Sequence, residues 1–448
     1  INHKKYMLKK ITNLSVKIAE RCIPDPLVIA IGLTMMCFII AISFTPYSAL
    51  DTIDAWGRGY WSLLAFTAQM ILILSLGHLV AHTKPVNALL KKISNKFSSA
   101  KSAYIGITLI ASFSSLFSWG IGLILPAILS CIIASNLKRR NIKVHFPLLV
   151  YCGYAGSLVG MQGLSSTIPL ILNTPNHFLV DKIGLISLSD TIFSNWSMLI
   201  VLSIMIALPI FVSNLHPDKV REYTGENIKI KDTNVKKLDS DKWHLSQKLE
   251  NSRYITLLLG VFAGIYSLQH FIQGGSLNLN SLNMIFVVLG LLFSDSVKHY
   301  IELLSNAAKV AGPFLIQYPL YAGLMGMMAE SGLAEIFVNG FVAISSSESL
   351  ALWTFLSAGI LNIFIPSAGG QWAVQGPIII EAALQLGADI PRVSMAVVLG
   401  ELWTNAIQPL YLVPVLAITG LNIRDIMGYS ILGLFLCATI YISALVFF

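Results

Sequence analysis

The sequence predicts an all-α integral membrane protein with about nine transmembrane spans and two re-entrant helical hairpins, arranged as an inverted-topology repeat. Of its 448 residues, 55% are hydrophobic and only 12% are charged, about half the charged share of a soluble domain. Apolar stretches near the roughly 20 residues that cross a bilayer recur along the chain. Two further apolar stretches have polar and helix-breaking residues at their centres. A water-soluble globule is excluded.

The spans are expected where apolar residues continue long enough to cross. They lie at 27–45, 61–82, 146–172, 196–215, 254–273, 279–294, 312–330, 394–418 and 427–448. Residues 216–253 mix Lys, Asp, Glu and Asn with few large apolar residues, so this segment cannot fold alone. The chain is therefore expected to divide into a first repeat at 1–215, a cytoplasmic linker at 216–253, a connecting span at 254–273 and a second repeat at 274–448.

The positive charges sort by side of the membrane. Of the 30 Lys and Arg, 27 fall on one predicted side, and only Arg58, Lys182 and Arg392 fall on the other. The positive-inside rule makes the rich side cytoplasmic. The N-terminus is then cytoplasmic and the C-terminus outside. Topology and anionic lipid headgroups account for the net charge of +8, so the lipid bilayer is the expected partner and nucleic acid is not.

Residues 102–137 are too short to cross the membrane twice, because an out-and-back pair of spans needs about 40 residues and a turn. Lys101 and Lys138 flank this segment on the cytoplasmic side. Ser and Gly cluster at its centre, from Ser114 to Gly122. The pattern predicts a re-entrant hairpin that opens to the cytoplasm and has its tip near the middle of the membrane.

The same pattern recurs at 350–386. Its centre, from Ile365 to Pro377, is rich in Gly, Gln and Pro. The flanking segments contain one Arg and no Lys, so this second hairpin is expected to open to the exterior.

A span interrupted by glycine and proline follows each hairpin. The breaks are expected within 151–169 and 400–409, because in a helix glycine costs about 1 kcal/mol and internal proline about 3 kcal/mol. Pairing Pro126 with Pro377, Gly153 with Gly400 and Pro169 with Pro414 gives offsets of 251, 247 and 245. One extra crossing at 254–273 turns the second copy upside down, which is the inverted repeat typical of secondary transporters.

The two tips and the two breaks should meet in one site, because irregular backbone at membrane depth must be enclosed by protein or line a cavity. Free amides bind anions, and free carbonyls with hydroxyl or amide oxygens bind sodium. The expected substrate-binding residues are Ser118, Trp119, Gly120, Ser367, Gly369, Gly370, Gln371, Trp372, Thr404 and Asn405. The expected coupling-ion residues are Ser165, Ser166, Thr167, Glu401 and Gln408.

Each of these features also has a plainer explanation. Small residues at the first tip also suit close helix packing, and Trp119 and Trp372 are either apolar walls of the site or packing residues. Glu401 is an intramembrane ionisable residue and therefore a candidate for the ion or proton path. Because no Lys or Arg lies inside a span, an anion would be held by amides, hydroxyls and a co-bound cation. No enzyme motif appears, the five cysteines have no regular spacing, and neither a cofactor nor a metal site is expected.

Several motifs resemble those of the short-chain fatty acid transporter family. In the second half they are PSAGGQWAVQGP at 366–377 and GELWTNAIQP at 400–409. The motifs IPDP at 23–26, QM at 69–70, GH at 77–78 and RDIMGY at 424–429 extend the resemblance over nearly the whole chain. The resemblance implies uptake of a small monocarboxylate, such as butyrate or acetoacetate, across a bacterial inner membrane.

The family is similar to a wider ion-transporter superfamily, which adds two expectations. Its dicarboxylate carriers have Ser-Asn-Thr at both tips and bind sodium, whereas the tips here read Ser118-Trp119-Gly120 and Ser367-Ala368-Gly369. Na⁺ and H⁺ therefore both remain candidates for the co-transported cation. The superfamily also implies that a homodimer can form. The alternatives are a channel or facilitator for small organic anions, or a carrier for another small carboxylate such as a dicarboxylate.

Overall fold

The chain is built from α-helices in its computed structural model, which describes residues 26–217, 219–224, 244–312, 314–365 and 368–447 and has no strand within them. By length and composition, seven of the described helices could cross a membrane, or up to eight if a bent pair of helices forms one span. An all-helical membrane protein is thus confirmed. The count of nine spans also relies on shorter apolar helices and stays a prediction.

The first half of the chain alternates long apolar helices with shorter ones. Its helices are α2 Pro26–Phe44, α3 Ala49–Tyr60, α4 Leu64–Ala81, α5 Lys84–Ser94, α6 Ala100–Phe117, α7 Trp119–Arg139, α8 Phe146–Ser157, the 3-10 turn η1 Gly160–Gln162, α9 Thr167–Leu172, α10 Val180–Ile183 and α11 Asn195–Ser213.

The second half follows with α12 Leu245–Glu250, α13 Arg253–Ile272, α14 Leu279–Phe293, α15 Val297–Ala311, α16 Phe314–Glu330, α17 Leu333–Ile344, α18 Leu350–Phe364, α19 Ala368–Leu386, α20 Ile390–Asn405, α21 Pro409–Thr419 and α22 Ile423–Phe447. From α14 onward, four helices, a hairpin pair and an interrupted helix follow one another in the same order as from α2 onward in the first half.

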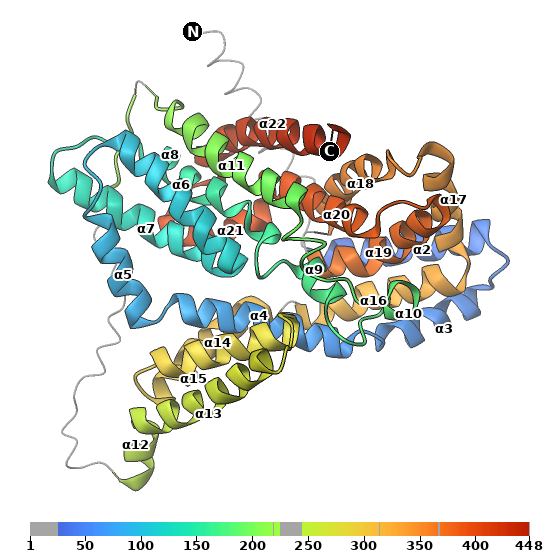
Figure 1. The fold of residues 1–448 in the computed structure, drawn as a ribbon, viewed down its shortest axis with the longest axis horizontal. Coiled ribbons are helices and arrows are strands. Elements are labelled where there is room, and N and C mark those ends of the chain that lie inside the picture. Colours follow the sequence, from blue (N-terminus) through green and yellow to red (C-terminus); the bar gives the residue numbers. More distant parts are fainter. Residues whose placement is uncertain (1–25, 218, 225–243, 313, 366–367, 448) are drawn as a thin grey trace.

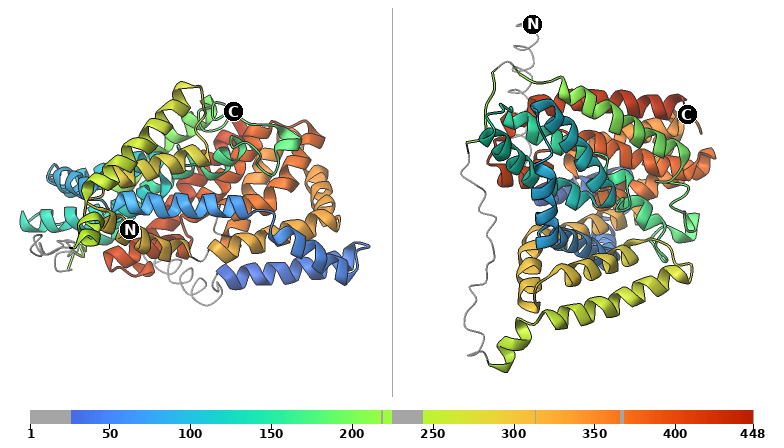
Figure 2. Two further views of the ribbon diagram at one scale, coloured as in Figure 1. Left: turned by 90° about the horizontal axis from the view of Figure 1, so that it is seen from below. Right: turned by 60° about the vertical axis from the view of Figure 1, so that its left-hand side comes forward.

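The helices form two layers, drawn in Figure 1 with one above the other. A core layer contains α6 to α9, α11 and α18 to α22, and a peripheral layer contains α2 to α4 and α13 to α16. In the peripheral layer the halves interleave: α4 packs on α14 and α15, and α16 packs on α2 and α3. Helix α13 packs mainly on α14 at the edge of the molecule, and only 17% of its apolar window is buried inside the protein (Figure 2).

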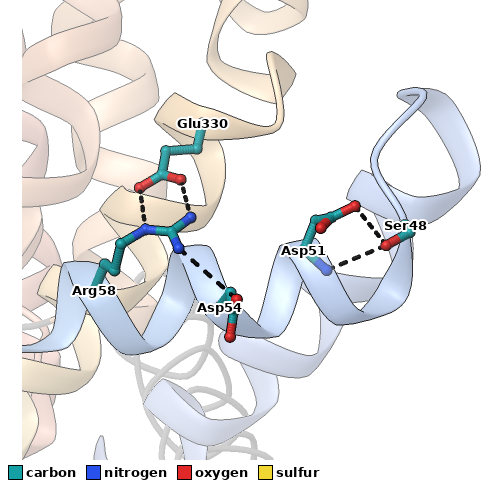
Figure 3. A network of polar contacts seen from close by, with 5 residues as sticks. All are labelled: Ser48, Asp51, Asp54, Arg58 and Glu330. Carbon is teal, nitrogen blue, oxygen red and sulfur yellow. Dashed lines mark hydrogen bonds and ion pairs between the residues drawn. The ribbon is translucent and has the colours of Figure 1, made fainter.

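Four short helices, α3, α5, α15 and α17, were not predicted from the sequence. They combine apolar and polar faces and are too short or too polar for a search that looks for continuous apolar runs. In α3, the Ser48 side chain caps the first turn by accepting a hydrogen bond from the Asp51 amide. Arg58 then joins α3 to Glu330 at the end of α16, with nitrogen–oxygen distances of 2.5 and 3.3 Å (Figure 3). Exposed pairs of this kind contribute about 1 kcal/mol or less, so this pair orients the two helices more than it stabilises them.

In both halves the interrupted helix crosses its hairpin at a glycine. A Cβ added to Gly156 of α8 would lie 2.3 Å from the carbonyl oxygen of Thr108 in α6. A Cβ added to Gly400 of α20 would likewise lie 2.3 Å from the carbonyl oxygen of Phe355 in α18. Only glycine allows backbones to approach this closely in a membrane protein. The contact that Gly400 makes is therefore reproduced by Gly156, three residues beyond the Gly153 with which the sequence pattern pairs it.

Candidate functional site

The first tip is sharper than its sequence suggests. Ser118 is its only non-helical residue, with α6 ending before it and α7 beginning after it. Ser118 adopts an extended conformation, and its hydroxyl accepts a long hydrogen bond of 3.5 Å from the Ile121 amide. Trp119 and Gly120 lie in the first turn of α7, so the expected irregular stretch from 114 to 122 is mostly helix. One serine that caps the second helix is enough to reverse the chain.

The first break holds this tip in place. It covers residues 158–166, between α8 and α9, and lies inside the range expected from the sequence. The Ser165 hydroxyl accepts a hydrogen bond of 2.8 Å from the Trp119 amide. The Ser166 hydroxyl donates to the Met161 carbonyl, and the Thr167 hydroxyl lies 4.0 Å from the Met161 sulfur. Two of the three hydroxyls expected to bind an ion therefore have partners within the break, and Ser165 joins the break to the tip.

The second tip is also shorter than expected. Helix α18 ends at Phe364 and α19 begins at Ala368, so Gly369 to Pro377 are helical. Ser367 lies outside the described residues. The glycines here serve packing: a Cβ at Gly369 would lie 2.5 Å from the ring of Phe66 in α4, and one at Gly370 would lie 2.6 Å from the ring of Tyr321 in α16. The second tip thus presses against two aromatic rings of the peripheral layer.

The second break covers only residues 406–408. Glu401, Thr404 and Asn405 lie in the last turns of α20 and not in the break, contrary to the expectation from the sequence. Glu401 is 2% exposed, and none of the ion pairs among the described residues includes it. Gln408, the last residue of the break, bonds back to the end of α18.

Asn362 of α18 joins the second tip to the second break. It is fully buried, and its side-chain nitrogen donates to the Glu401 carbonyl at 3.1 Å, the Thr404 hydroxyl at 2.9 Å and the Asn405 side-chain oxygen at 2.8 Å. The Gln408 side-chain nitrogen donates in turn to the Asn362 carbonyl at 3.2 Å. Three of the four amide and hydroxyl side chains in this network, Thr404, Asn405 and Gln408, were predicted, but the central one, Asn362, was not.

Gln371 extends this network along the hairpin. Its side-chain nitrogen donates to the Ala358 carbonyl of α18 and to the Gln375 side-chain oxygen, both at 3.0 Å. Gln375 donates to the Ser357 hydroxyl at 3.0 Å. Trp372, its neighbour in α19, is completely buried, and its ring nitrogen has no partner.

Three side-chain amide oxygens of this network have no hydrogen-bond donor. The side-chain oxygens of Asn362, Gln371 and Gln408 are buried and accept no hydrogen bond, although the nitrogens of all three side chains are bonded. A buried acceptor without a partner is destabilising by about 1–3 kcal/mol. These three oxygens come from one tip and its break, and the Thr404 hydroxyl bonds the Asn362 nitrogen. Amide and hydroxyl oxygens are ligands that a hard cation prefers.

Two tyrosines connect the first tip to the second break. The ring of Trp119 stacks on Tyr411 of α21 with 6.4 Å between ring centres. The ring centre of Tyr154 in α8 lies 6.4 Å from the ring centre of Tyr411. The Tyr154 hydroxyl donates a hydrogen bond to the Asn405 carbonyl. The predicted site residues therefore form two clusters, one at each tip, and Tyr154 and Tyr411 join them. Sequence reasoning missed both tyrosines, because aromatic residues in an apolar span carry no distinguishing signal, whereas Asn362 was a lone amide in an apolar run and could have been found.

Comparison with known proteins gives consistent results. The family model described as "Short chain fatty acid transporter" matches residues 7–448. A protein of Escherichia coli (strain K12) is 34% identical over 99% of this chain and the whole of that relative. One of Haemophilus influenzae is 32% identical over 98% of this chain and the whole of that relative. Both carry the description "Putative short-chain fatty acid transporter".

Two solved structures share the fold. The Alcanivorax borkumensis YdaH transporter superposes with a TM-score of 0.57 at 14% identity, over 94% of this chain and 98% of its own. Neisseria gonorrhoeae MtrF, whose structure is described with a class of antimetabolite efflux pumps, superposes with a TM-score of 0.55 at 15% identity, over 97% and 96%. At these identities the likeness shows the fold alone.

Proposed function

The chain belongs to the short chain fatty acid transporter family, and on that premise we propose that it is a secondary carrier that takes up small monocarboxylates together with a cation. Transport proceeds by alternating access around the two tips in a bacterial inner membrane. The observation that carries the proposal is the paired construction of the site. Each half contributes one hairpin tip and one interrupted helix, and three side-chain amide oxygens of the second pair are buried and accept no hydrogen bond.

A coupling cation fits the second cluster. The free side-chain oxygens of Asn362, Gln371 and Gln408 are the proposed ligands. Glu401 lies in α20, where its carbonyl accepts a hydrogen bond from Asn362, and a buried carboxyl with no ion-pair partner requires either a proton or a nearby bound cation. Coupling also meets an energetic need, because an anion entering against an inside-negative potential loses about 2.3 kcal/mol per 100 mV. One cation cancels that term, and a second makes uptake favourable.

The substrate is proposed to lie between the clusters. Trp119 and Tyr411 supply aromatic surface for a short acyl chain, and the amides and hydroxyls of the tips supply hydrogen bonds for the carboxyl group. The hydrogen bonds that Trp119, Asn362 and Gln371 form at this site involve no Lys or Arg. A small monocarboxylate is therefore proposed in preference to a polyanion.

The ion pairs support the proposed topology. Lys182 pairs with Glu381 at 2.6 Å, and the charge distribution puts both residues outside. Arg221 pairs with Asp425 at 2.5 Å, and both belong to the cytoplasmic side. The same agreement holds for Arg58 with Glu330 outside and for Lys84 with Asp295 inside. Inverted repeats, a cytoplasmic N-terminus and an external C-terminus are proposed on this basis.

The experiment that tests the proposal is uptake of radiolabelled butyrate into proteoliposomes, with sodium and proton gradients imposed separately. Accumulation against a butyrate gradient, driven by one of the two, is the expected result and identifies the cation. Saturable equilibration that responds to neither gradient would replace the carrier by a facilitator. Uptake of a dicarboxylate but not of butyrate would overturn the proposed substrate.

A further inference from the structure

A large apolar pocket lies between α11 and the first break. Its volume is about 490 Å³, within the range of small-molecule sites. Helix α11 forms one wall with Met198, Leu202 and Met205, and the end of α6 with the first break, 162–164, forms the other. Met198 and Leu202 are 53% and 55% exposed, so in a membrane the mouth of the pocket faces lipid.

Gln162 is the one amide of the first break in the wall of this pocket. The residue is 3% exposed, and neither its side-chain nitrogen nor its side-chain oxygen has a hydrogen-bond partner. Leaving both atoms unbonded in a buried position is destabilising by about 1–3 kcal/mol for each. No hydrogen bond therefore holds the amide away from a ligand, and a ligand with one donor and one acceptor would satisfy it.

The chemistry of such a ligand follows from the lining. A protonated carboxylic acid has one hydroxyl donor and one carbonyl acceptor, which match the two atoms of the amide. A carboxylate can only accept, so it would leave the Gln162 oxygen facing a negative charge. The described residues of the lining include no Lys, Arg or His, and burying an unpaired carboxylate costs far more than burying the neutral acid. The pocket therefore favours the uncharged acid, with its acyl chain against α11.

A second, polar pocket of about 510 Å³ adjoins the first. The two pockets share Phe193 and Asn195, and the polar one is lined further by Asp190, Trp196 and Asp389. Both of its chain segments belong to the side that the charges make external. Two carboxylates at this position repel an anion and tolerate a neutral acid. The polar pocket therefore lies between the outer surface and the apolar pocket.

We infer that the apolar pocket is a lateral binding site for an uncharged short-chain carboxylic acid, which reaches the first tip through it from the outer half of the bilayer. The inference rests on the proposed function and adds that the substrate carries its own proton. The pocket ends against the first tip, because Leu116, two residues before Ser118, lines it and its carbonyl accepts a hydrogen bond of 2.7 Å from the Leu164 amide. The cation at the second cluster is then the second charge that drives uptake.

Photo-crosslinking tests this site without requiring transport. The full chain in lipid nanodiscs is labelled with a short aliphatic carboxylic acid that carries a diazirine, and the labelled residues are found by mass spectrometry. The expected result is label between Met198 and Met205 that hexanoic acid displaces. Because the neutral fraction of an aliphatic acid rises roughly tenfold for each unit by which the pH falls towards its pKa, labelling should rise steeply as the pH is lowered from about 7 to about 6.

Two matched variants locate the label. Leu202→Trp fills the pocket, and Ile206→Trp places the same ring one turn further on the same helix, where the residue is equally exposed at 55% but does not line the pocket. Loss of the label in the first variant and not in the second is expected. Gln162→Leu should weaken the labelling, because the variant lacks the amide that pairs with the carboxyl group, but should keep its dependence on pH, which is set by protonation of the acid.

Three results would overturn the inference: equal labelling of wild type and Leu202→Trp, labelling that does not respond to pH in the wild type, or displacement by added phospholipid but not by hexanoic acid, which would make the occupant a lipid chain. The outcome is independent of the proposed function. Labelling as expected without any butyrate uptake would contradict only the carrier, and butyrate uptake with no labelling would contradict only the lateral site.

Discussion

At the scale of single residues, the site depends on the side chain that the sequence highlighted least. Asn362 donates to three acceptors of α20 and receives a bond from Gln408 on its own carbonyl. The motifs at 366–377 and 400–409 attracted attention because several polar residues stand together in each. Asn362 precedes them alone in the apolar sequence of α18, so density of polar residues was the wrong criterion and depth in the membrane was the right one.

Asn362→Leu should abolish cation-driven uptake and lower stability. The change keeps a side chain of similar size but leaves the Thr404 hydroxyl and the Asn405 oxygen without their donor, a loss of about 1–3 kcal/mol for each buried group. Uptake in proteoliposomes and the thermal unfolding midpoint in detergent measure the two effects. Asn214→Leu, an exposed asparagine at the end of α11, is the control and should match wild type. Full uptake by Asn362→Leu would remove this residue from the site.

Glu401→Gln should separate binding from coupling. The side chain keeps its size and its hydrogen-bonding capacity but cannot take up a proton or neutralise a cation. Uptake driven by the imposed cation gradient should be lost, while exchange of labelled butyrate across liposomes without a gradient should persist. Glu335→Gln, in the exposed first turn of α17, is the control. Unchanged gradient-driven uptake would assign Glu401 a purely structural role.

At the scale of elements, the sequence predicts where the chain reverses but overestimates how much of it is irregular. Gly369, Gly370 and Pro377 are helix breakers by propensity, yet α19 runs through all three. Propensity describes an isolated helix, and in this protein aromatic rings from neighbouring helices occupy the space that the glycines leave open. Glycine in a membrane span therefore indicates either a break or a close contact, and the sequence alone does not distinguish them. The short amphipathic helices α3, α5, α15 and α17 were not predicted, because a search for continuous apolar runs does not detect helices that are polar on one face.

The glycine crossings make a prediction about stability. Gly400→Ala places a methyl group 2.3 Å from a backbone oxygen of α18, so α18 and α20 must separate. Overpacking of this kind destabilises by about 1–3 kcal/mol, which should appear as a lower unfolding midpoint. Gly340→Ala in α17, where nothing lies within 4 Å of the added methyl group, should be neutral or stabilising by about 0.5–1 kcal/mol. Equal midpoints for the two variants would contradict the close crossing.

The segment after α11 is docked on the cytoplasmic end of the core layer and should respond to pH. The Arg221 amide donates to the side-chain nitrogen Nδ1 of His145 at 3.0 Å, and the Phe146 amide donates to the Arg221 carbonyl at 2.8 Å. Burial, with smaller contributions from the charges of His216 and Arg221, lowers the pKa of His145 to about 4, although Asp425 opposes this. The neutral ring is therefore the form that the folded state favours.

The docking of this segment should weaken as the pH falls. Because the folded pKa of His145 lies below the ordinary value of 6.5, its contribution is complete above that value and is lost as the pH falls towards 4. The protection factor of the Arg221 amide, which is the ratio of the intrinsic exchange rate at each pH to the observed rate, should decrease as the pH falls over this interval. His145→Asn keeps an acceptor that does not titrate, and its exchange profile should be flatter. An identical profile in the variant would assign the effect to another group.

At the scale of the whole molecule, the two layers touch where the tips meet the peripheral helices. A Cβ added to Gly77 of α4 would lie 3.5 Å from the Ser118 hydroxyl oxygen, within reach of a disulfide. The double variant Gly77→Cys with Ser118→Cys, in a background without other cysteines, should stop uptake when oxidised and recover when reduced, because alternating access requires the layers to move past one another. The single Gly77→Cys variant controls for the oxidant. Undiminished uptake by the crosslinked protein would favour a fixed pore.

The order of parts in the whole chain could be predicted because it depends on charge and span length, which are properties of segments. The interleaving of the halves could not. Nothing in the composition of α4 or α16 indicates that each will pack on helices of the other half. A helix face that contacts lipid and one that contacts another helix both consist of apolar residues, so composition does not distinguish them.

This interleaving has a consequence for biosynthesis. Helix α4 leaves the ribosome roughly 230 residues ahead of the end of α15, one of the helices on which it packs. At about 5–20 residues per second, α4 waits roughly 10 to 45 s in the membrane before that partner exists. During this interval lipid, or an insertion chaperone, must occupy the face that α15 later covers. A nascent chain arrested before residue 297 should therefore be the species that membrane quality control recognises and degrades.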